Sequence, residues 1–219
     1  MPCLPAKDRH NPKFVQITEF AGNGQKDARI VKVEKTALPG VYRIKPVRHG
    51  DNRGFFAETY AKNKLAALGL EADFVQDNHS VSVDAPTLRG LHFQAPPRAQ
   101  AKLVRCGRGA LFDVAVDIRK GSPTYGQWVG EDLTAENGVQ LWIPPGFAHG
   151  FVTRQPNTEI IYKCSDDYAP ETEGALIWDD PAIGIDWGLG GAVPCLSAKD
   201  EAAPGFEGFD SPFNWERSV

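Results

Sequence analysis

From residue 30 to about residue 178, the chain is a succession of short segments in which apolar residues recur at every second position. Glycine and proline separate these segments, and such alternation is typical of strands with one buried face. A single short helix is predicted over 62–69, with Gly69 as its stop. Many short strands with so little helix predict an all-β sandwich or jelly roll. The strands are predicted at 30–33, 41–44, 74–83, 88–94, 102–106, 110–118, 126–133, 139–143, 149–154, 159–164 and 175–178.

Turn residues link several of these strands. Pro39-Gly40 predicts a turn between the first two, and Gly107-Arg108-Gly109 predicts a hairpin between 102–106 and 110–118. Within 111–118 the even-numbered positions are all apolar, which predicts a face packed in the core. The odd-numbered face carries Asp113 and Asp117. It is either the wall of a polar cavity or a face open to solvent.

Length and charge limit the organisation and the partners. The 219 residues fit one domain with tails, and we expect an N-terminal extension at 1–29, a β domain at 30–204 and a C-terminal tail at 205–219. A net charge of -4 does not favour binding to nucleic acid or to membranes. The sequence shows no signal peptide and no apolar run long enough for a transmembrane helix. The four cysteines form no C-x-x-C pair, which indicates a cytoplasmic protein with reduced thiols.

Two histidine motifs suggest the chemistry. The run 144–149, PPGFAH, ends at His149 and resembles the distal histidine motif of the cupin β-barrels. The run 88–94, LRGLHFQ, lies where a cupin carries its metal-binding H-x-H and Glu, but it contains His92 alone. Lys102 follows ten residues later. This pattern predicts acid/base chemistry next to a carbonyl, without a metal.

Each candidate residue also has a plain structural interpretation. The neutral imidazole of His92 can accept a proton near pH 7, but His92 can equally be a hydrogen-bonded structural residue. Lys102 lies on the same strand face as apolar residues and can stabilise an oxyanion, or it can extend to solvent. Tyr162 can donate a proton or simply pack within a strand. The sequence alone does not select Asp200 as the partner of His92. Cations beside turns could hold phosphates, and these are Arg53, Arg89 and Lys199.

Seven runs together resemble the dTDP-4-dehydrorhamnose 3,5-epimerase family. The resemblance extends in order from about residue 32 to residue 204, and a set of this kind is far more specific than one motif. The runs are 51–58 (DNRGFFAE), 74–80 (FVQDNHS), 88–94 (LRGLHFQ), 102–106 (KLVRC), 112–119 (FDVAVDIR), 142–151 (WIPPGFAHGF) and 197–200 (SAKD).

The resemblance implies a cupin-type jelly-roll barrel with short peripheral helices, a homodimer, and an enzyme of rhamnose biosynthesis with no metal and no cofactor. It implies that His92 is the base, with Asp200 as its partner, that Lys102 faces the C4 oxygen, and that Tyr162 donates the proton. Asp113 is implied as a supporting acid near His149. Tyr168 corresponds to a tyrosine that stacks on thymine. The other implied substrate contacts are Arg53, Glu58, Gln76, Asn78, Arg89, His149, Glu173 and Lys199.

The implied reaction inverts C3 and C5 of dTDP-4-dehydro-6-deoxy-D-glucose through enolates, giving dTDP-4-dehydro-L-rhamnose. Three alternatives stay open: an epimerase that acts at C3 or C5 only, a metal-dependent cupin, and a barrel that binds a sugar nucleotide without catalysis. Asp167 departs from the family pattern, because many relatives carry a second tyrosine there. Residues 1–29 and the aromatic tail 205–219 also lie outside that pattern.

Overall fold

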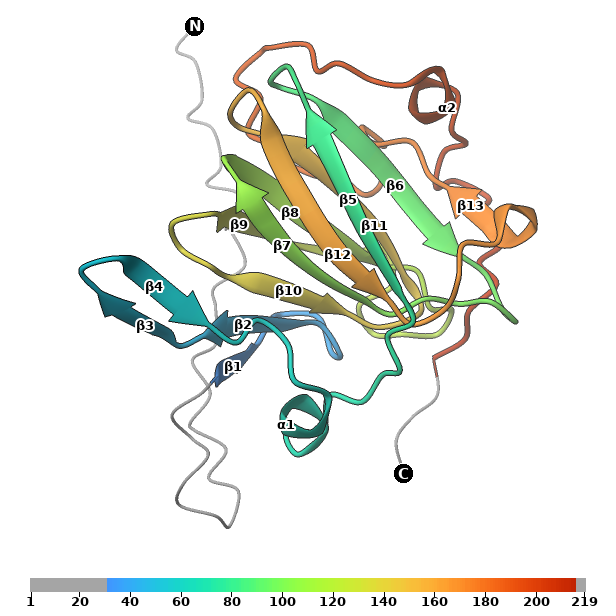
Figure 1. The fold of residues 1–219 in the computed structure, drawn as a ribbon. Coiled ribbons are helices and arrows are strands. Elements are labelled where there is room, and N and C mark those ends of the chain that lie inside the picture. Colours follow the sequence, from blue (N-terminus) through green and yellow to red (C-terminus); the bar gives the residue numbers. More distant parts are fainter. Residues whose placement is uncertain (1–30, 216–219) are drawn as a thin grey trace, which may run out of the picture.

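The computed structural model describes residues 31–215 as two facing antiparallel sheets with a projecting hairpin (Figure 1). The predicted extension 1–29 and the last four residues of the tail lie outside the described residues. The six-stranded sheet contains, in order, β1 (Val31–Lys35), β2 (Tyr42–Pro46), β10 (Gln140–Ile143), β7 (Lys102–Arg108), β12 (Thr158–Cys164) and β5 (Gln76–Ser82). The five-stranded sheet contains β13 (Glu173–Ala175), β6 (Leu88–Gln94), β11 (Phe147–Thr153), β8 (Ala110–Asp117) and β9 (Trp128–Thr134).

The remaining elements are small and peripheral. Among the strands of residues 31–215, β3 (Arg48–Asp51) and β4 (Gly54–Ala57) pair only with each other. Two short α-helices are α1 (Lys62–Ala66) and α2 (Ala198–Glu201), and a 3₁₀ turn spans Pro170–Thr172. The prediction of an all-β, cupin-type jelly roll with short helices is therefore confirmed. None of the helices within residues 31–215 is long and apolar enough to span a membrane.

Local predictions from the sequence were mostly correct, and the exceptions concern the pairing of two strands and the bounds of two others. The turn at Pro39-Gly40 joins β1 to β2, and Gly40 has a φ of +99°. The hairpin predicted at Gly107-Arg108-Gly109 is wrong, because β7 and β8 belong to different sheets. This turn instead carries the chain from one sheet to the other. The strand predicted at 175–178 lies at Glu173–Ala175, and the one predicted at 149–154 begins earlier, at Phe147.

Three apolar clusters stabilise the molecule. The first lies between the two sheets and includes Val104, Leu141 and Ile160 from the six-stranded sheet and Leu111 and Ala115 from β8. The second covers the outer face of the five-stranded sheet, where the C-terminal segment packs. Burial of these side chains contributes roughly 25 cal/mol for each Å² of apolar surface removed from water. The third packs the segment around α1 against the outer face of the six-stranded sheet.

Strand β8 is buried on both faces. Its even-numbered residues Val114 and Val116 pack under the C-terminal segment, together with Phe206 and Phe209 of the tail. Its odd-numbered residues face the space between the sheets, and Asp113 and Asp117 are both 0% exposed. The alternative of a solvent-facing sheet is therefore wrong.

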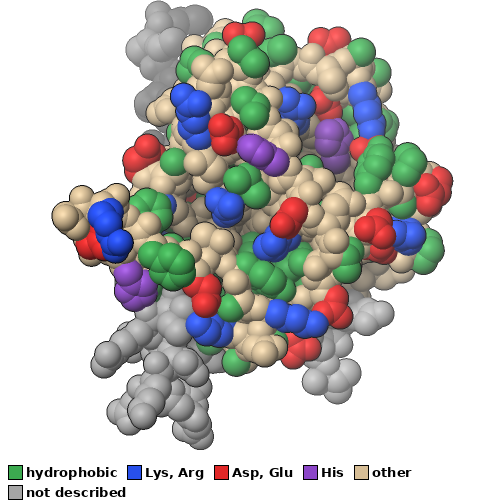
Figure 2. Space-filling model, in the orientation of Figure 1, with side chains coloured by type: hydrophobic (Ala, Val, Ile, Leu, Met, Phe, Trp, Pro, Cys, Tyr) green, Lys and Arg blue, Asp and Glu red, His purple; other side chains and the backbone are tan. Residues whose placement is uncertain are grey.

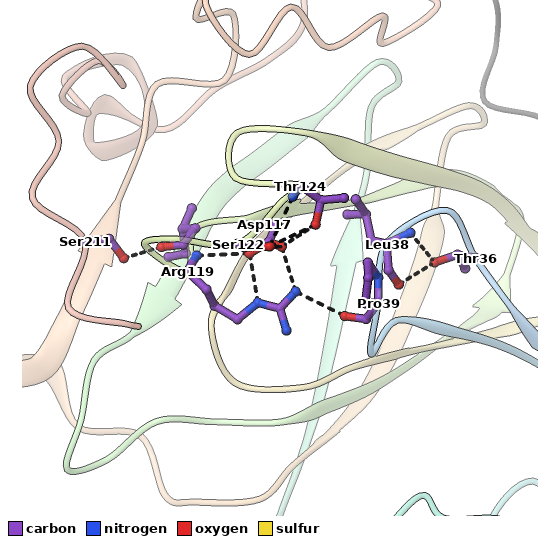
Figure 3. A network of polar contacts seen from close by, with 9 residues as sticks. Thr36, Leu38, Pro39, Asp117, Arg119, Ser122, Thr124 and Ser211 are labelled. Carbon is purple, nitrogen blue, oxygen red and sulfur yellow. Dashed lines mark hydrogen bonds and ion pairs between the residues drawn. The ribbon is translucent and has the colours of Figure 1, made fainter. Parts of the chain in front are cut away.

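Asp117 anchors the end of β8 to the loop that follows it (Figure 3). Its carboxylate accepts hydrogen bonds from Arg119 Nε at 2.8 Å, and from the hydroxyls of Ser122 and Thr124 at 2.6 Å each. Burial alone would raise the pKa of Asp117, but these hydrogen bonds outweigh it and hold the pKa below its ordinary value. Arg119 Nη2 also donates to Pro39 O at 3.1 Å, which ties the first turn to this end of the barrel.

The surface in front of the six-stranded sheet mixes both signs of charge. In Figure 2, lysine and arginine side chains lie among aspartate and glutamate side chains, with apolar groups between them. Alternating signs of this kind do not produce a strong field over this face. This distribution agrees with the small net charge of the chain.

Candidate active site

Strand β6 places His92 on the inner face of the five-stranded sheet. His92 lies directly opposite His149 of β11, and the neighbouring Phe147 and Phe151 of that strand belong to the core between the sheets. Gly90 allows the close approach of the two strands. A Cβ at this position would lie 2.6 Å from His149 O, and the φ of Gly90 is +108°. Glycine is therefore required two residues before His92.

His92 is paired with a buried carboxylate that lies 108 residues further along the chain. Its Nε2 lies 2.6 Å from Asp200 Oδ1, and the Asp200 side chain is 4% exposed. Ser197 caps α2 by accepting from Asp200 N at 3.2 Å, and its hydroxyl donates to Asp200 Oδ2 at 2.7 Å. Gly90 N also donates to Asp200 Oδ1, at 3.3 Å. The short helix therefore delivers Asp200 to the back of the imidazole.

Hydrogen bonds keep Asp200 ionised. Burial alone would raise the pKa of Asp200, but the bonds from His92 and Ser197 outweigh it and lower the pKa. An ionised carboxylate only accepts hydrogen bonds, so Nε2 of His92 carries the proton in this pair. The other ring nitrogen, Nδ1, is then the basic one.

Lys102 and Tyr162 come from the opposite sheet. Lys102 opens β7 on the face shared with Val104, and Tyr162 of β12 lies directly opposite Val104 in register. Burial lowers the pKa of the Lys102 ammonium, and nearby Cys164, Asp113 and Glu173 oppose that shift. Burial raises the pKa of the Tyr162 phenol above its ordinary value of 10, so the phenol stays protonated at neutral pH.

These groups surround one cavity of about 310 Å³ between the sheets. His92 lies on one wall, and Lys102 and Tyr162 lie on the other. Seven of the predicted site residues line this cavity. Its lining residues are Gln76, Asn78, His92, Phe93, Gln94, Gln100, Lys102, Tyr162, Tyr168 and Glu173.

Glu173 joins two other predicted residues beside the cavity. Its Oε2 accepts from Tyr168 Oη at 2.8 Å and lies 2.5 Å from Lys199 Nζ. Burial alone would raise the pKa of Glu173, but the hydrogen bonds from Lys199 and Tyr168 outweigh it and lower the pKa. The hydrogen bond to Glu173 in turn raises the pKa of Lys199. Tyr168 itself is 57% exposed, so its ring is open to a ligand.

His149 and Asp113 form a second buried pair. His149 Nε2 lies 2.8 Å from Asp113 Oδ1, and the two side chains are 8% and 0% exposed. The other carboxylate oxygen of Asp113 has no hydrogen-bond partner. Arg89, on β6, is exposed, and its charge opposes the upward shift of the Tyr162 pKa.

Two predicted substrate residues lie away from this cavity. Arg53 sits in the turn of the β3–β4 hairpin, 85% exposed, and its Nη2 is 2.5 Å from Asp51 Oδ2. Glu58 follows the hairpin and accepts from Lys64 Nζ at 2.8 Å. The hairpin projects from the side of the molecule opposite β13 and α2 (Figure 1). Within this chain, the structure does not bring these two residues to His92.

Several residues around the cavity were not predicted from the sequence. Gln94 lies two positions after His92 and Gln100 two positions before Lys102, and both line the cavity. Alternation along β6 was the signal that could have identified Gln94, whereas Gln100 precedes β7 and no strand pattern marks it. Cys164 lies opposite Lys102, and Asn78 Nδ2 donates to its sulfur at 3.6 Å. No local sequence signal marks that contact.

The site is built for proton transfer beside a carbonyl. A base and a phenol on opposite walls can act on the two faces of a bound ring. The ammonium of Lys102, on the same wall as the phenol, can stabilise an oxyanion that forms in the cavity. Within residues 31–215, no three His, Cys, Asp or Glu side chains cluster closely enough to hold a metal ion.

Comparisons with known proteins identify relatives over most of the chain. The family model for dTDP-4-dehydrorhamnose 3,5-epimerase matches residues 35–208. The dTDP-4-dehydrorhamnose 3,5-epimerase of Salmonella typhimurium is 56% identical over 173 residues, which are 78% of this chain and 93% of the relative.

Solved structures show the same similarity. The dTDP-6-deoxy-D-glucose-3,5-epimerase of Legionella pneumophila, in complex with dTDP-4-keto-L-rhamnose, has a TM-score of 0.80 and 44% identity, covering 85% of this chain and 99% of that one. A 3'-monoepimerase of Streptomyces bikiniensis, in complex with dTDP-quinovose, has a TM-score of 0.73 and 35% identity, covering 77% of this chain and 85% of that one.

Proposed function

The chain belongs to the dTDP-4-dehydrorhamnose 3,5-epimerase family, and on that premise we propose that it inverts C3 and C5 of dTDP-4-dehydro-6-deoxy-D-glucose, giving dTDP-4-dehydro-L-rhamnose. One observation carries the proposal. His92 and Tyr162 line the same cavity from opposite sheets. Inversion of a carbon centre requires removal of a proton on one face and delivery on the other, and this arrangement supplies both.

In the proposed mechanism, Nδ1 of His92 removes a proton next to the C4 ketone. The electron pair moves into an enolate whose negative charge lies on O4. Lys102 stabilises that charge by a charge-assisted hydrogen bond. The imidazolium is stabilised by Asp200 at 2.6 Å. Tyr162 then gives its proton to the opposite face of the carbon, which leaves a tyrosinate and an imidazolium. Proton exchange with solvent returns His92 to the neutral form and Tyr162 to the phenol, and the same groups then invert the second centre.

The other predicted residues serve binding in this proposal. Tyr168 is exposed at the cavity and stacks on the thymine ring. Lys199 and Arg89 supply positive charge for the diphosphate, since a chain with a net charge of -4 must bind an anion through local cations. Gln76, Asn78, Glu173 and His149 contribute hydrogen bonds, and Asp113 orients His149 at 2.8 Å.

A second candidate is inversion at a single carbon. It is favoured by the similarity to a 3'-monoepimerase, which is 35% identical to this chain over the matched residues. Both reactions use a base and an acid on opposite faces, so His92 and Tyr162 do not distinguish them.

Proton NMR of the 4-keto sugar nucleotide in deuterated water tests both candidates. The double epimerase incorporates deuterium at C3 and C5 and inverts both centres. Label and inversion at one carbon alone, after long incubation, would support the mono-epimerase instead. His92→Asn is the matched control, because it keeps a polar side chain in the cavity but removes the base. Labelling by that variant at the wild-type rate would refute the assignment of His92.

We further propose a homodimer in which the β3–β4 hairpin of one copy completes the cavity of the other. Phe55 and Phe56 on the hairpin are 59% and 72% exposed, as is typical of surfaces that become buried on association. The hairpin also carries Arg53, which lies away from the cavity of its own chain.

Mixing two inactive variants tests this arrangement. If the hairpin of each subunit completes the other's cavity, a heterodimer of His92→Asn and Arg53→Ala subunits has one site with both defects and one site with neither. Recovery of activity on mixing is expected if Arg53 acts on the other copy. No recovery, with dimers demonstrated by analytical ultracentrifugation, would place Arg53 in its own subunit's site.

The proposed compartment is the cytoplasm. Cys106, Cys164 and Cys195 are free thiols, which agrees with a reducing environment. Cell fractionation followed by immunoblotting tests this directly, and recovery of the protein in an oxidising compartment would contradict it.

A further inference from the structure

Gln94 connects the strand that carries His92 to the loop that carries Tyr168. Its side chain is 5% exposed, and its Oε1 accepts from Ala169 N at 3.0 Å. Its Nε2 donates to Asp167 O at 3.0 Å and also to Arg98 O. The two N–H groups and the oxygen of this buried amide therefore all bind backbone atoms. Two of these atoms lie on either side of Tyr168, and the third lies in the loop after β6.

The same loop has further anchors that act on its other positions. Arg98 Nη2 lies 2.7 Å from Asp166 Oδ1, and Gln100 Nε2 donates to Asp166 O at 2.8 Å. Gln76 Oε1 accepts from Tyr168 N at 2.9 Å. Among these anchors, Gln94 is the most buried, and it alone contacts both the residue before Tyr168 and the residue after it, since Arg98 reaches only Asp167, at 3.7 Å.

We infer that Gln94 is a positioning residue that fixes Tyr168 for the nucleoside, and so sets nucleotide affinity without taking part in proton transfer. The inference rests on the proposed function, in which Tyr168 stacks on thymine. Tyr168 is held at its backbone by Gln76 and at its phenol by Glu173, while Gln94 fixes the peptide groups on both sides. A stacking ring must be held in place before binding, because ordering it on binding would reduce affinity.

Glutamine is the residue type that this geometry requires. Two backbone carbonyls need donors and one backbone N–H needs an acceptor, and a neutral amide supplies all three. A carboxylate of the same length would still accept from Ala169 N but would face two carbonyl oxygens without a proton. Buried groups left without partners are costly, so the loop would move.

Calorimetry of dTDP binding, together with steady-state kinetics, tests the inference with Gln94→Glu and Gln94→Met. We expect the Kd for dTDP to rise about tenfold, the factor that corresponds to one unpaired buried hydrogen-bonding group. We expect kcat to stay within about twofold of wild type, since the variants leave the groups of the proton-transfer step in place. The Met variant avoids the buried charge and provides the test if the Glu variant does not fold.

Asn137→Asp is the matched control. Asn137 likewise bridges a loop, accepting from Val139 N at 2.9 Å and donating to Asp132 O at 2.7 Å, but it lies outside the cavity. Asn137→Asp removes an N–H group that donates to a backbone carbonyl, as Gln94→Glu does. Its Kd for dTDP should equal that of wild type. An equal rise in both variants would show general destabilisation and overturn the inference.

A double-mutant cycle with Tyr168→Ala identifies the route of the effect. In the Tyr168→Ala background, Gln94→Glu should raise the Kd no further, because the ring it positions is gone. An unchanged Kd in folded Gln94 variants, or effects that add fully in the cycle, would refute the positioning role. If the wild type neither binds dTDP nor turns over the 4-keto sugar, the proposed function itself fails. If the wild type does both, a negative result concerns Gln94 alone.

Discussion

Asp200→Asn removes the charge behind the proposed base while keeping the shape of the side chain. The orientation of the new amide follows from the contacts of Asp200. Gly90 N donates to Oδ1 at 3.3 Å, so the amide nitrogen is disfavoured at that position and the oxygen stays toward His92. Ser197, whose hydroxyl can both donate and accept, tolerates the amide nitrogen at the other position. The imidazole therefore keeps its tautomer, and the variant tests charge alone.

The expected loss follows from the distance between the two groups. His92 Nε2 and Asp200 Oδ1 are 2.6 Å apart, so the two charges lie about 4 Å apart. At that separation, Coulomb's law gives about 4 kcal/mol for an effective dielectric constant of about 20. The His92 side chain is 31% exposed. Solvent screening therefore lowers the value to about 2–3 kcal/mol, or about 30- to 160-fold in kcat.

The assay is loss of substrate in proton NMR, with dTDP affinity measured in parallel. Asp200→Asn should lower kcat by the stated factor and leave the Kd for dTDP within about twofold, because Asp200 touches His92 and not the nucleotide. Ser197→Ala serves as the control, since it removes the hydrogen bond to Asp200 Oδ2 and the cap bond from Asp200 N but leaves the charge of the carboxylate, and we expect a loss under about tenfold. Turnover of Asp200→Asn within about threefold of wild type would refute the dyad.

Three further predictions concern the opposite wall and the metal. Tyr162→Phe should retain deuterium exchange on the face of His92 but lose most inversion in the NMR assay; unchanged inversion would assign proton delivery to another group. Burial lowers the pKa of Lys102 in the folded protein below its ordinary 10.5. Between the folded pKa and 10.5, the unfolded chain therefore binds more protons than the folded one, and the free energy of unfolding rises with pH. Lys102→Met should therefore raise the Tm at pH 7 while lowering kcat by about 10²- to 10³-fold, and a lower Tm by calorimetry would contradict the stated cost of burial. Activity should survive prolonged chelation and dialysis, and loss restored by one particular metal would support the metal-dependent cupin instead.

Much of the fold could be predicted because strand alternation is a local property. The pattern at 88–94 gave β6 with its observed ends, and the even-numbered positions of 111–118 were predicted to be packed, as Val114 and Val116 are. Pairing is not local. The glycines at 107 and 109 indicate a turn, but they do not specify whether the chain returns along the same sheet. In this molecule β7 and β8 lie in opposite sheets, and only the packing of the whole barrel determines that.

The candidate site could be predicted to the extent that its residues lie on strands. His92, Lys102 and Tyr162 were each assigned a strand, and the structure brings all three to one cavity. Asp200 was beyond sequence reasoning alone, because it reaches His92 from a four-residue helix after a long C-terminal segment. The family resemblance named it, and the structure supplies the physical reason: Ser197 caps the helix and turns the carboxylate toward the imidazole.

The division of roles between the two sheets explains why the cavity suits an epimerase. A base and an acid on one strand would approach a ring from the same side and return the proton to the face it left. His92 and Tyr162 instead belong to sheets that face each other, so in the proposed mechanism the barrel itself separates proton removal from proton delivery. Gln94 lies in the same strand as His92, two positions further, and reaches the loop of Tyr168. Under the proposed function, the register of this single strand therefore sets both where the proton is taken and where the nucleoside is held, and a shift by one residue would displace both functions together.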